Sequence, residues 1–155
     1  MRRCFIAISI LCLLAIALPA GQKTVSGGVL KVLPHLLDLK GRHTLSPSLY
    51  ERDAYQAYLR SHPEEVSGIR YDIQWKSKNA KGEKLKLRVQ LRSDVKDKPP
   101  GEKTMETEVE GGRGREWTSI SLTGDDFKSF GKTTAWRVTL WNGDELLGEQ
   151  KSFLW

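Results

Sequence analysis

His35, Asp38 and His43 are of residue types that bind metal ions, and they follow one another closely in the sequence. In a strand, residues three positions apart point to opposite faces, so His35 and Asp38 are not expected to share an ion. The spacing also matches no common zinc pattern. We therefore predict surface polar residues here, and the sequence predicts neither a metal site nor a cofactor.

Side chains for covalent or acid–base catalysis do not form a recognised pattern. The chain has no Gly-x-Ser-x-Gly nucleophile motif, and its two cysteines, Cys4 and Cys12, lie in an apolar run at the start. Asp125 and Asp126 are carboxylates of the kind that glycoside hydrolysis uses in pairs, but a sequence does not set their separation. We therefore predict that the protein is not an enzyme, with a small hydrolase as a less favoured alternative.

Tryptophan and arginine side chains in two turns are the strongest candidates for a binding site. Trp141 lies beside an Asn-Gly turn, and Arg113 and Arg115 lie in the glycine-rich run 111–115. An exposed indole offers an apolar face to a sugar or a protein partner, and a guanidinium offers paired donors to carboxylates. If successive strands alternate in direction, both turns lie at one end of the protein. We therefore predict Trp141, Arg113 and Arg115 as ligand-binding residues for an unknown protein or carbohydrate partner.

Basic residues alternate along the segment 84–92, a pattern that nucleic-acid-binding surfaces show. They are Lys84, Lys86, Arg88 and Arg92. Another predicted strand carries Glu106, Glu108 and Glu110, so we expect cross-strand ion pairs if the two strands are neighbours. The net charge of the whole chain, +6, is also modest. We therefore predict no nucleic-acid partner.

The first 20 residues have the composition of a secretory signal peptide. Two arginines precede an apolar run from Cys4 to Leu18, and Pro19-Ala20 supplies a small residue for cleavage. A run of about 15 residues is shorter than the ~20 that a membrane-spanning helix needs, and no second such run follows. We therefore expect cleavage near Ala20, export to the periplasm or out of the cell, and no transmembrane segment in the mature chain.

One helix is predicted at about 48–61. Ser48 and Glu51 fit a capping box, and the residue before Pro63 disfavours helical backbone. One stripe of this helix is mostly apolar, and we expect it to be buried: Tyr50, Ala54, Ala57 and Tyr58. The opposite stripe is polar: Arg52, Gln56 and Arg60. As an alternative to an exposed Trp141, this helix covers the sheet surface around that residue.

Alternating apolar and polar residues predict strands in most of the remaining chain. The clearest is 85–91, where Leu85, Leu87, Val89 and Leu91 are expected to point inward. The apolar segment 29–39 predicts an edge strand that is broken near Pro34. In the last hairpin, we expect Leu140 to lie opposite Leu146 and Arg137 opposite Glu149.

Seven short strands with turns every 8–12 residues or so predict a single β-sandwich domain over residues 29–155. A flexible segment, 21–28, precedes it. In outline this architecture resembles the immunoglobulin or fibronectin type III class, with the helix 48–61 inserted between the first two strands. The Cys…Trp…Cys signature of true immunoglobulin domains is absent, so the resemblance implies a fold class and no function.

These observations favour an exported, non-catalytic binding or accessory module of unknown ligand. The alternative is an envelope assembly or adhesin-type subunit that joins its neighbour through an edge strand. A small outer-membrane barrel is less favoured, because charged residues such as Lys86 and Glu106 interrupt the strand faces that lipid would contact.

Overall fold

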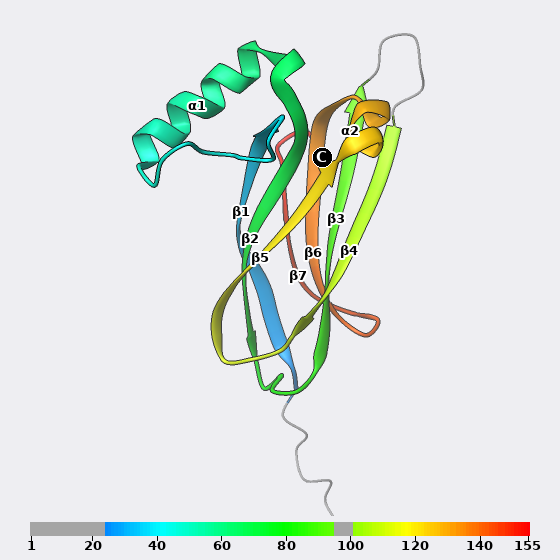
Figure 1. The fold of residues 1–155 in the computed structure, drawn as a ribbon. Coiled ribbons are helices and arrows are strands. Elements are labelled where there is room, and N and C mark those ends of the chain that lie inside the picture. The colour runs from blue at the N-terminus through cyan, green and yellow to red at the C-terminus, as the bar shows by residue number, and fades with distance from the viewer. Residues whose placement is uncertain (1–23, 95–100) are drawn as a thin grey trace, which may run out of the picture.

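A computed structural model describes residues 24–94 and 101–155 of the chain. These residues form seven strands in two antiparallel sheets, packed in a sandwich-like arrangement (Figure 1). The strands are β1 (Ser26–Asp38), β2 (Val66–Lys78), β3 (Lys84–Asp94), β4 (Gly101–Glu110), β5 (Gly114–Thr123), β6 (Lys132–Asn142) and β7 (Glu145–Lys151). The sheet orders are β1-β2-β5 and β4-β3-β6-β7. The predicted mainly β, seven-stranded, two-sheet fold is therefore confirmed.

Both ends of the described chain bear on the sequence predictions. The predicted signal peptide, residues 1–20, lies outside the described residues. β1 begins at Ser26, inside the segment 21–28 that was expected to be flexible. β1 therefore begins before the apolar residues from which it was predicted. Gly27 and Gly28 have no side chain to form an alternating pattern, but their backbone pairs with β2.

The core lies between the two sheets and is filled by the alternating residues of the central strands. On β3, the four residues predicted to point inward are all buried: Leu85, Leu87, Val89 and Leu91. Tyr71, Ile73 and Trp75 meet them from β2. Because a strand alternates its side chains between two faces, one buried face fixes the direction of every residue on it.

The helix α1 (Leu49–Ser61) lies between β1 and β2 in sequence, as predicted, and the Ser48 hydroxyl accepts a hydrogen bond from the Glu51 backbone N–H at its start. The prediction of its buried stripe is wrong. Gln56 and Leu59 are buried, whereas Tyr50 is 84% exposed. The helix packs against β1 rather than over Trp141. Gln56 is buried there because its amide can bond the free backbone groups of β1, which an apolar side chain cannot do.

β1 is an edge strand, as predicted, but it continues through Pro34 without a break. The backbone N–H of Leu36 points away from β2, because it donates to the side chain of Gln56. Backbone N–H directions alternate along a strand, so the nitrogen of Pro34 faces the same open edge. No ladder hydrogen bond is lost there, and the proline does not interrupt the strand.

The register of the β6–β7 hairpin differs from the prediction. Leu140 lies opposite Gly148 rather than Leu146, because the pairing shifts by one residue between Leu140 and Trp141. Gly148 also approaches β1, where an added Cβ would lie 2.8 Å from the Cα of Gly28. The predicted contact between Arg137 and Glu149 still forms, diagonally across the pair at 2.8 Å.

Two short helical segments were not predicted. η1 (Pro63–Glu65) follows α1, and α2 (Gly124–Phe130) lies in the crossing between β5 and β6. α2 buries Phe130 against the core and ends at Gly131, whose φ of 81° suits glycine. α1 and α2 lie at the same end of the sandwich (Figure 1). No helix in the described part of the chain is long and apolar enough to cross a membrane.

Candidate binding site

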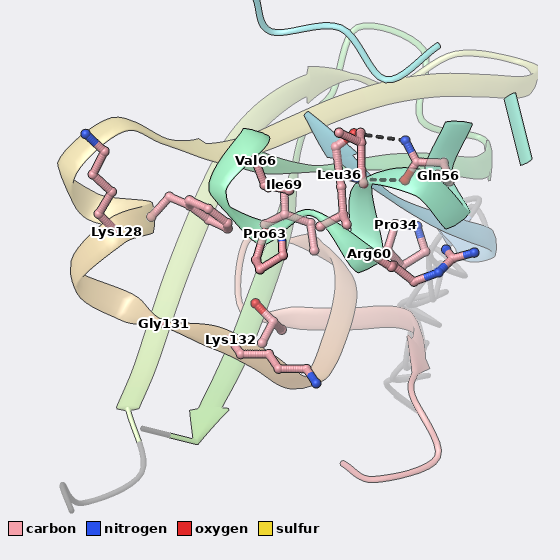
Figure 2. Close-up of a pocket in the computed structure, with 13 residues that line it drawn as sticks. Pro34, Leu36, Gln56, Arg60, Pro63, Val66, Ile69, Lys128, Gly131 and Lys132 are labelled. Atoms are coloured by element: carbon pink, nitrogen blue, oxygen red, sulfur yellow. Dashed lines mark hydrogen bonds between the residues drawn. The ribbon is translucent and has the colours of Figure 1, made fainter. Parts of the chain in front are cut away.

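A cavity of about 760 Å³ opens at the end of the sandwich where α1 and α2 lie (Figure 2). Its walls come from six elements, which are β1, α1, η1, β2, α2 and β6, together with the residue that ends α2. The lining residues are Pro34, Leu36, Gln56, Leu59, Arg60, Pro63, Val66, Ile69, Phe127, Lys128, Gly131, Lys132 and Thr133. The cavity therefore exists only where segments distant in sequence meet.

Gln56 holds the α1 wall of this cavity in place. Its side-chain carbonyl accepts from the backbone N–H of Leu36 at 2.8 Å. Its amide nitrogen donates to the carbonyls of Leu36 and His43, at 2.9 and 2.8 Å. The buried amide therefore bonds the backbone N–H and C=O at the open edge of β1, as a neighbouring strand would. Both of its N–H donors are used. This contact directs Leu59 and Arg60 of the helix toward the cavity.

The floor of the cavity is apolar. Leu59 is fully buried and Ile69 nearly so, and Pro63 and Val66 continue the surface where η1 leads into β2. α2 adds the ring of Phe127 from the other side. A concave apolar surface of this size suits a small ligand, because sites of about 300–1,000 Å³ bury most of a small molecule.

Three cations surround this apolar floor. Arg60, Lys128 and Lys132 lie around the edge of the cavity (Figure 2). Among the residues that the structure describes, no carboxylate lines the cavity. Within the described residues, none of the three charges has a carboxylate partner within 4 Å, although Lys132 stands opposite Asp94 in the β3–β6 pairing. The cavity edge is therefore positively charged.

Two buried hydroxyl groups near the cavity lack hydrogen-bond partners within the described part of the chain. One belongs to Thr133, which lines the cavity, and the other to Tyr71, which is fully buried in the core. Burial raises the pKa of Tyr71 well above its usual range, so its phenol stays neutral. The Thr133 oxygen is enclosed and lies beside the Tyr71 phenol, so it is not exposed to a ligand in the cavity.

A polar cluster lies on the outer face of the three-stranded sheet. Asp72 accepts hydrogen bonds from Arg70 at 2.7 Å and from Ser119 at 2.6 Å, and its second oxygen lies 3.6 Å from His35. The His43 ring packs on His35 with 5.1 Å between centroids. The Ser119 hydroxyl donates to a carboxylate rather than to an imidazole, so the arrangement differs from a serine–histidine nucleophile. The cluster attaches the segment before α1 to the sheet.

The charges of this cluster follow from burial and from its hydrogen bonds. Burial lowers the pKa of His35, although the Asp72 carboxylate acts in the opposite direction. Burial also lowers the pKa of His43, and the nearby Arg70 guanidinium adds to the effect. Burial alone would raise the pKa of Asp72, but hydrogen bonds from Ser119 and Arg70 hold that pKa below its usual value. Both imidazoles are therefore neutral beside an ionised carboxylate at neutral pH.

Two of the other aspartates considered above, Asp126 and Asp38, are each bound to a cation. Asp126 accepts from Lys103 at 2.8 Å. Asp38 is buried and accepts from Arg42 and from the Tyr55 hydroxyl, which holds the loop before α1. His35 is buried as well, so the prediction of surface polar residues is wrong for these two positions. Within the described residues, no three His, Cys, Asp or Glu side chains are grouped to hold a metal ion.

The basic stripe of β3 is paired with β4, as predicted. Arg88 donates to Glu106 at 2.6 Å, and Lys86 lies 3.4 Å from the same carboxylate. Lys84 and Arg92 meet Glu108 and Glu102. These cross-strand pairs balance the positive charge of the stripe, as expected if the two strands are neighbours.

The three residues predicted to bind ligand lie far from the cavity. The turns that carry them are at the opposite end of the sandwich, both at the same end, as the alternation of strands predicts (Figure 1). Arg115 pairs with Lys76 in the three-stranded sheet, whereas Trp141 pairs with Lys86 in the four-stranded sheet. Their side chains face opposite outer surfaces, because Lys76 and Lys86 both point away from the core.

Trp141 is also engaged within its own sheet. Its indole N–H donates to the Thr139 hydroxyl at 2.8 Å, and the Arg88 guanidinium lies 5.3 Å from the ring centroid. Arg113 and Arg115 are exposed. The structure thus separates the predicted residues into two surfaces, and a binding role for either surface stays a prediction.

Sequence reasoning missed the cavity and its three cations. Arg60 was assigned to the polar stripe of α1, and Lys128 and Lys132 were not among the predicted binding residues. Comparison with known proteins does not change this picture, because no protein-family model matches the chain and no curated protein matches its sequence.

Proposed function

We propose that this chain is an exported, non-catalytic binding module whose ligand occupies the cavity between α1 and α2. The observation that carries the proposal is a cavity of about 760 Å³ that has an apolar floor and three cations, Arg60, Lys128 and Lys132, at its edge. Binding pockets combine a largely apolar surface with a few polar groups that orient the ligand.

Export is proposed from the residues at the start of the chain. Two arginines and the apolar run up to Leu18 support a signal peptide, with cleavage after Ala20. We expect the intact mass of the exported protein to correspond to a chain that begins at Gly21. A mass that includes Met1 would contradict cleavage.

The finer fold assignment is also a proposal. The orders β1-β2-β5 and β4-β3-β6-β7 support a place in the immunoglobulin or fibronectin type III class of sandwiches. An experimentally determined structure tests this assignment directly, because a different pairing of β4 or β5 would exclude it.

A neutral fluorescent probe such as N-phenyl-1-naphthylamine tests the cavity. We expect saturable binding to the wild type, and loss of binding in Val66→Trp, which adds bulk inside the lining. Leu146→Trp is the matched control, because Leu146 is exposed on β7 at the opposite end of the sandwich. Equal probe binding by both variants would contradict the proposed site.

Assembly through an edge strand is the second candidate function. β5 is an edge strand, and its stretch from Trp117 to Thr123 contains no charged residue and no proline. Such edges readily pair with another strand. Sedimentation velocity tests this candidate: polymers that grow with concentration support it, and a monomer at every concentration excludes it.

A further inference from the structure

We propose that the cavity binds a single-chain amphiphile with an acidic head group, of the fatty-acid class. This inference rests on the proposed function, because it names the ligand of the same cavity. The argument depends on three properties of the lining: which polar atoms are free, what charge surrounds the opening, and how much space lies inside.

The exposed polar side chains of the lining are donors. Gln56 is buried, and both of its amide hydrogens and its carbonyl oxygen already bond the backbone of β1 and the following loop. The Thr133 hydroxyl is also enclosed, so the polar side chains that remain for a ligand are the cations Arg60, Lys128 and Lys132. All three can donate a hydrogen bond to a carboxylate. A head group rich in acceptors therefore fits this site.

The same inventory disfavours a sugar. Carbohydrate hydroxyls need acceptors as well as donors, and the described lining contains no carboxylate and no free amide. Phe127 is its one aromatic ring. The donor-only edge and aliphatic floor match an alkyl chain that ends in an anion.

The positions of the cations indicate how such a ligand would lie. Lysine and arginine place their aliphatic stems along apolar surface and keep the charge in water. Arg60, Lys128 and Lys132 are exposed and lie around the edge (Figure 2). Leu59 and Ile69, which also line the cavity, are buried. The head group therefore lies at the opening and the alkyl chain extends inward. About 760 Å³ suits one chain of a monomeric ligand rather than a membrane surface.

The test compares dodecanoate, dodecanol and dodecyltrimethylammonium, each below its micellar concentration, as competitors of the neutral probe. We expect dodecanoate to bind about tenfold more tightly than dodecanol at low salt, and the ammonium compound to bind most weakly. A tenfold preference corresponds to about 1.4 kcal/mol, which a few exposed charge contacts supply. Added salt should reduce the affinity for dodecanoate and leave that for dodecanol unchanged.

Charge-removing variants assign the preference to the cavity edge. The triple variant Arg60→Gln, Lys128→Gln, Lys132→Gln should bind dodecanoate no better than dodecanol, while retained dodecanol binding shows that it is folded. The matched control, Lys76→Gln, Lys78→Gln, Lys81→Gln, removes three exposed cations at the opposite end and should keep the preference. Extending the chain by one methylene should raise affinity about fourfold until the cavity is filled.

The possible failures are distinguishable. Equal affinities for dodecanoate and dodecanol would overturn the acidic-head inference and leave the binding module intact. Failure of every compound, the neutral probe included, would overturn the proposed function as well. Binding to vesicles of anionic phospholipid without binding of monomeric dodecanoate would overturn the inference in favour of a membrane surface.

Discussion

Replacing Gln56 with leucine should release α1 from the edge of β1. The wild-type amide makes three hydrogen bonds to backbone groups of Leu36 and His43, and leucine makes none. Each such bond contributes about 0.5–1.5 kcal/mol net, and buried groups left without partners cost more. When the helix detaches, water can bond the freed backbone groups of β1, which limits the cost of leaving them without partners. We therefore expect the free energy of unfolding to fall by about 2–4 kcal/mol.

Urea unfolding followed by tryptophan fluorescence measures this loss, and hydrogen exchange locates it. The backbone amide of Leu36 should exchange much faster in Gln56→Leu, whereas amides of the central strand β3 should change only as much as global stability does. The neutral probe should also bind more weakly, because α1 forms one wall of the cavity.

Gln56→Glu is the matched variant for the donor half of this contact. A carboxylate still accepts from Leu36 N–H, but it cannot donate to the two carbonyls. We expect this variant to be destabilised at neutral pH and to recover partly in acid, where protonation restores one donor. A Gln56→Leu protein within about 0.5 kcal/mol of wild type would refute the view that the amide holds the helix.

Three further predictions concern the core, the histidine cluster and the predicted loop site. Leu87→Ala should cost about 2–5 kcal/mol, because Leu87 is fully buried, whereas Lys86→Ala should stay within about 0.5 kcal/mol; equal urea midpoints would contradict the assigned faces of β3. The lowered pKa values of His35 and His43 mean that the unfolded chain binds more protons below its histidine pKa of 6.5. Stability should therefore fall as pH drops below about 6.5, and His35→Gln with His43→Gln should flatten that slope in urea melts at several pH values. Trp141→Ala should leave cavity binding unchanged at a cost of about 1 kcal/mol or less; loss of ligand in a folded variant would favour the loop surface instead.

Local patterns in the sequence were enough to predict the strands and the position of α1. Apolar and polar residues alternate strictly from Leu85 to Leu91, and Ser48 caps α1 by accepting from the backbone N–H of Glu51, three residues later. Such signals depend on a residue and its near neighbours, and the backbone conformation follows from them without knowledge of distant partners. The pairing of β3 with β4 was also predictable, because oppositely charged residues recur with the same period on both strands.

Contacts between distant segments decided the rest. The buried stripe of α1 was predicted wrongly because Gln56 finds its partner twenty residues earlier, at an open strand edge that helical periodicity does not reveal. In the β6–β7 hairpin, Gly148 lies opposite Leu140 and packs closely against Gly28 of the other sheet, a contact that hairpin patterns do not reveal. The cavity shows the limit most clearly, since Arg60 and Lys132 share an edge only after two sheets and two helices have packed. Periodicity gives the direction of a side chain relative to its own backbone, but what it meets depends on which other segments the fold brings to it.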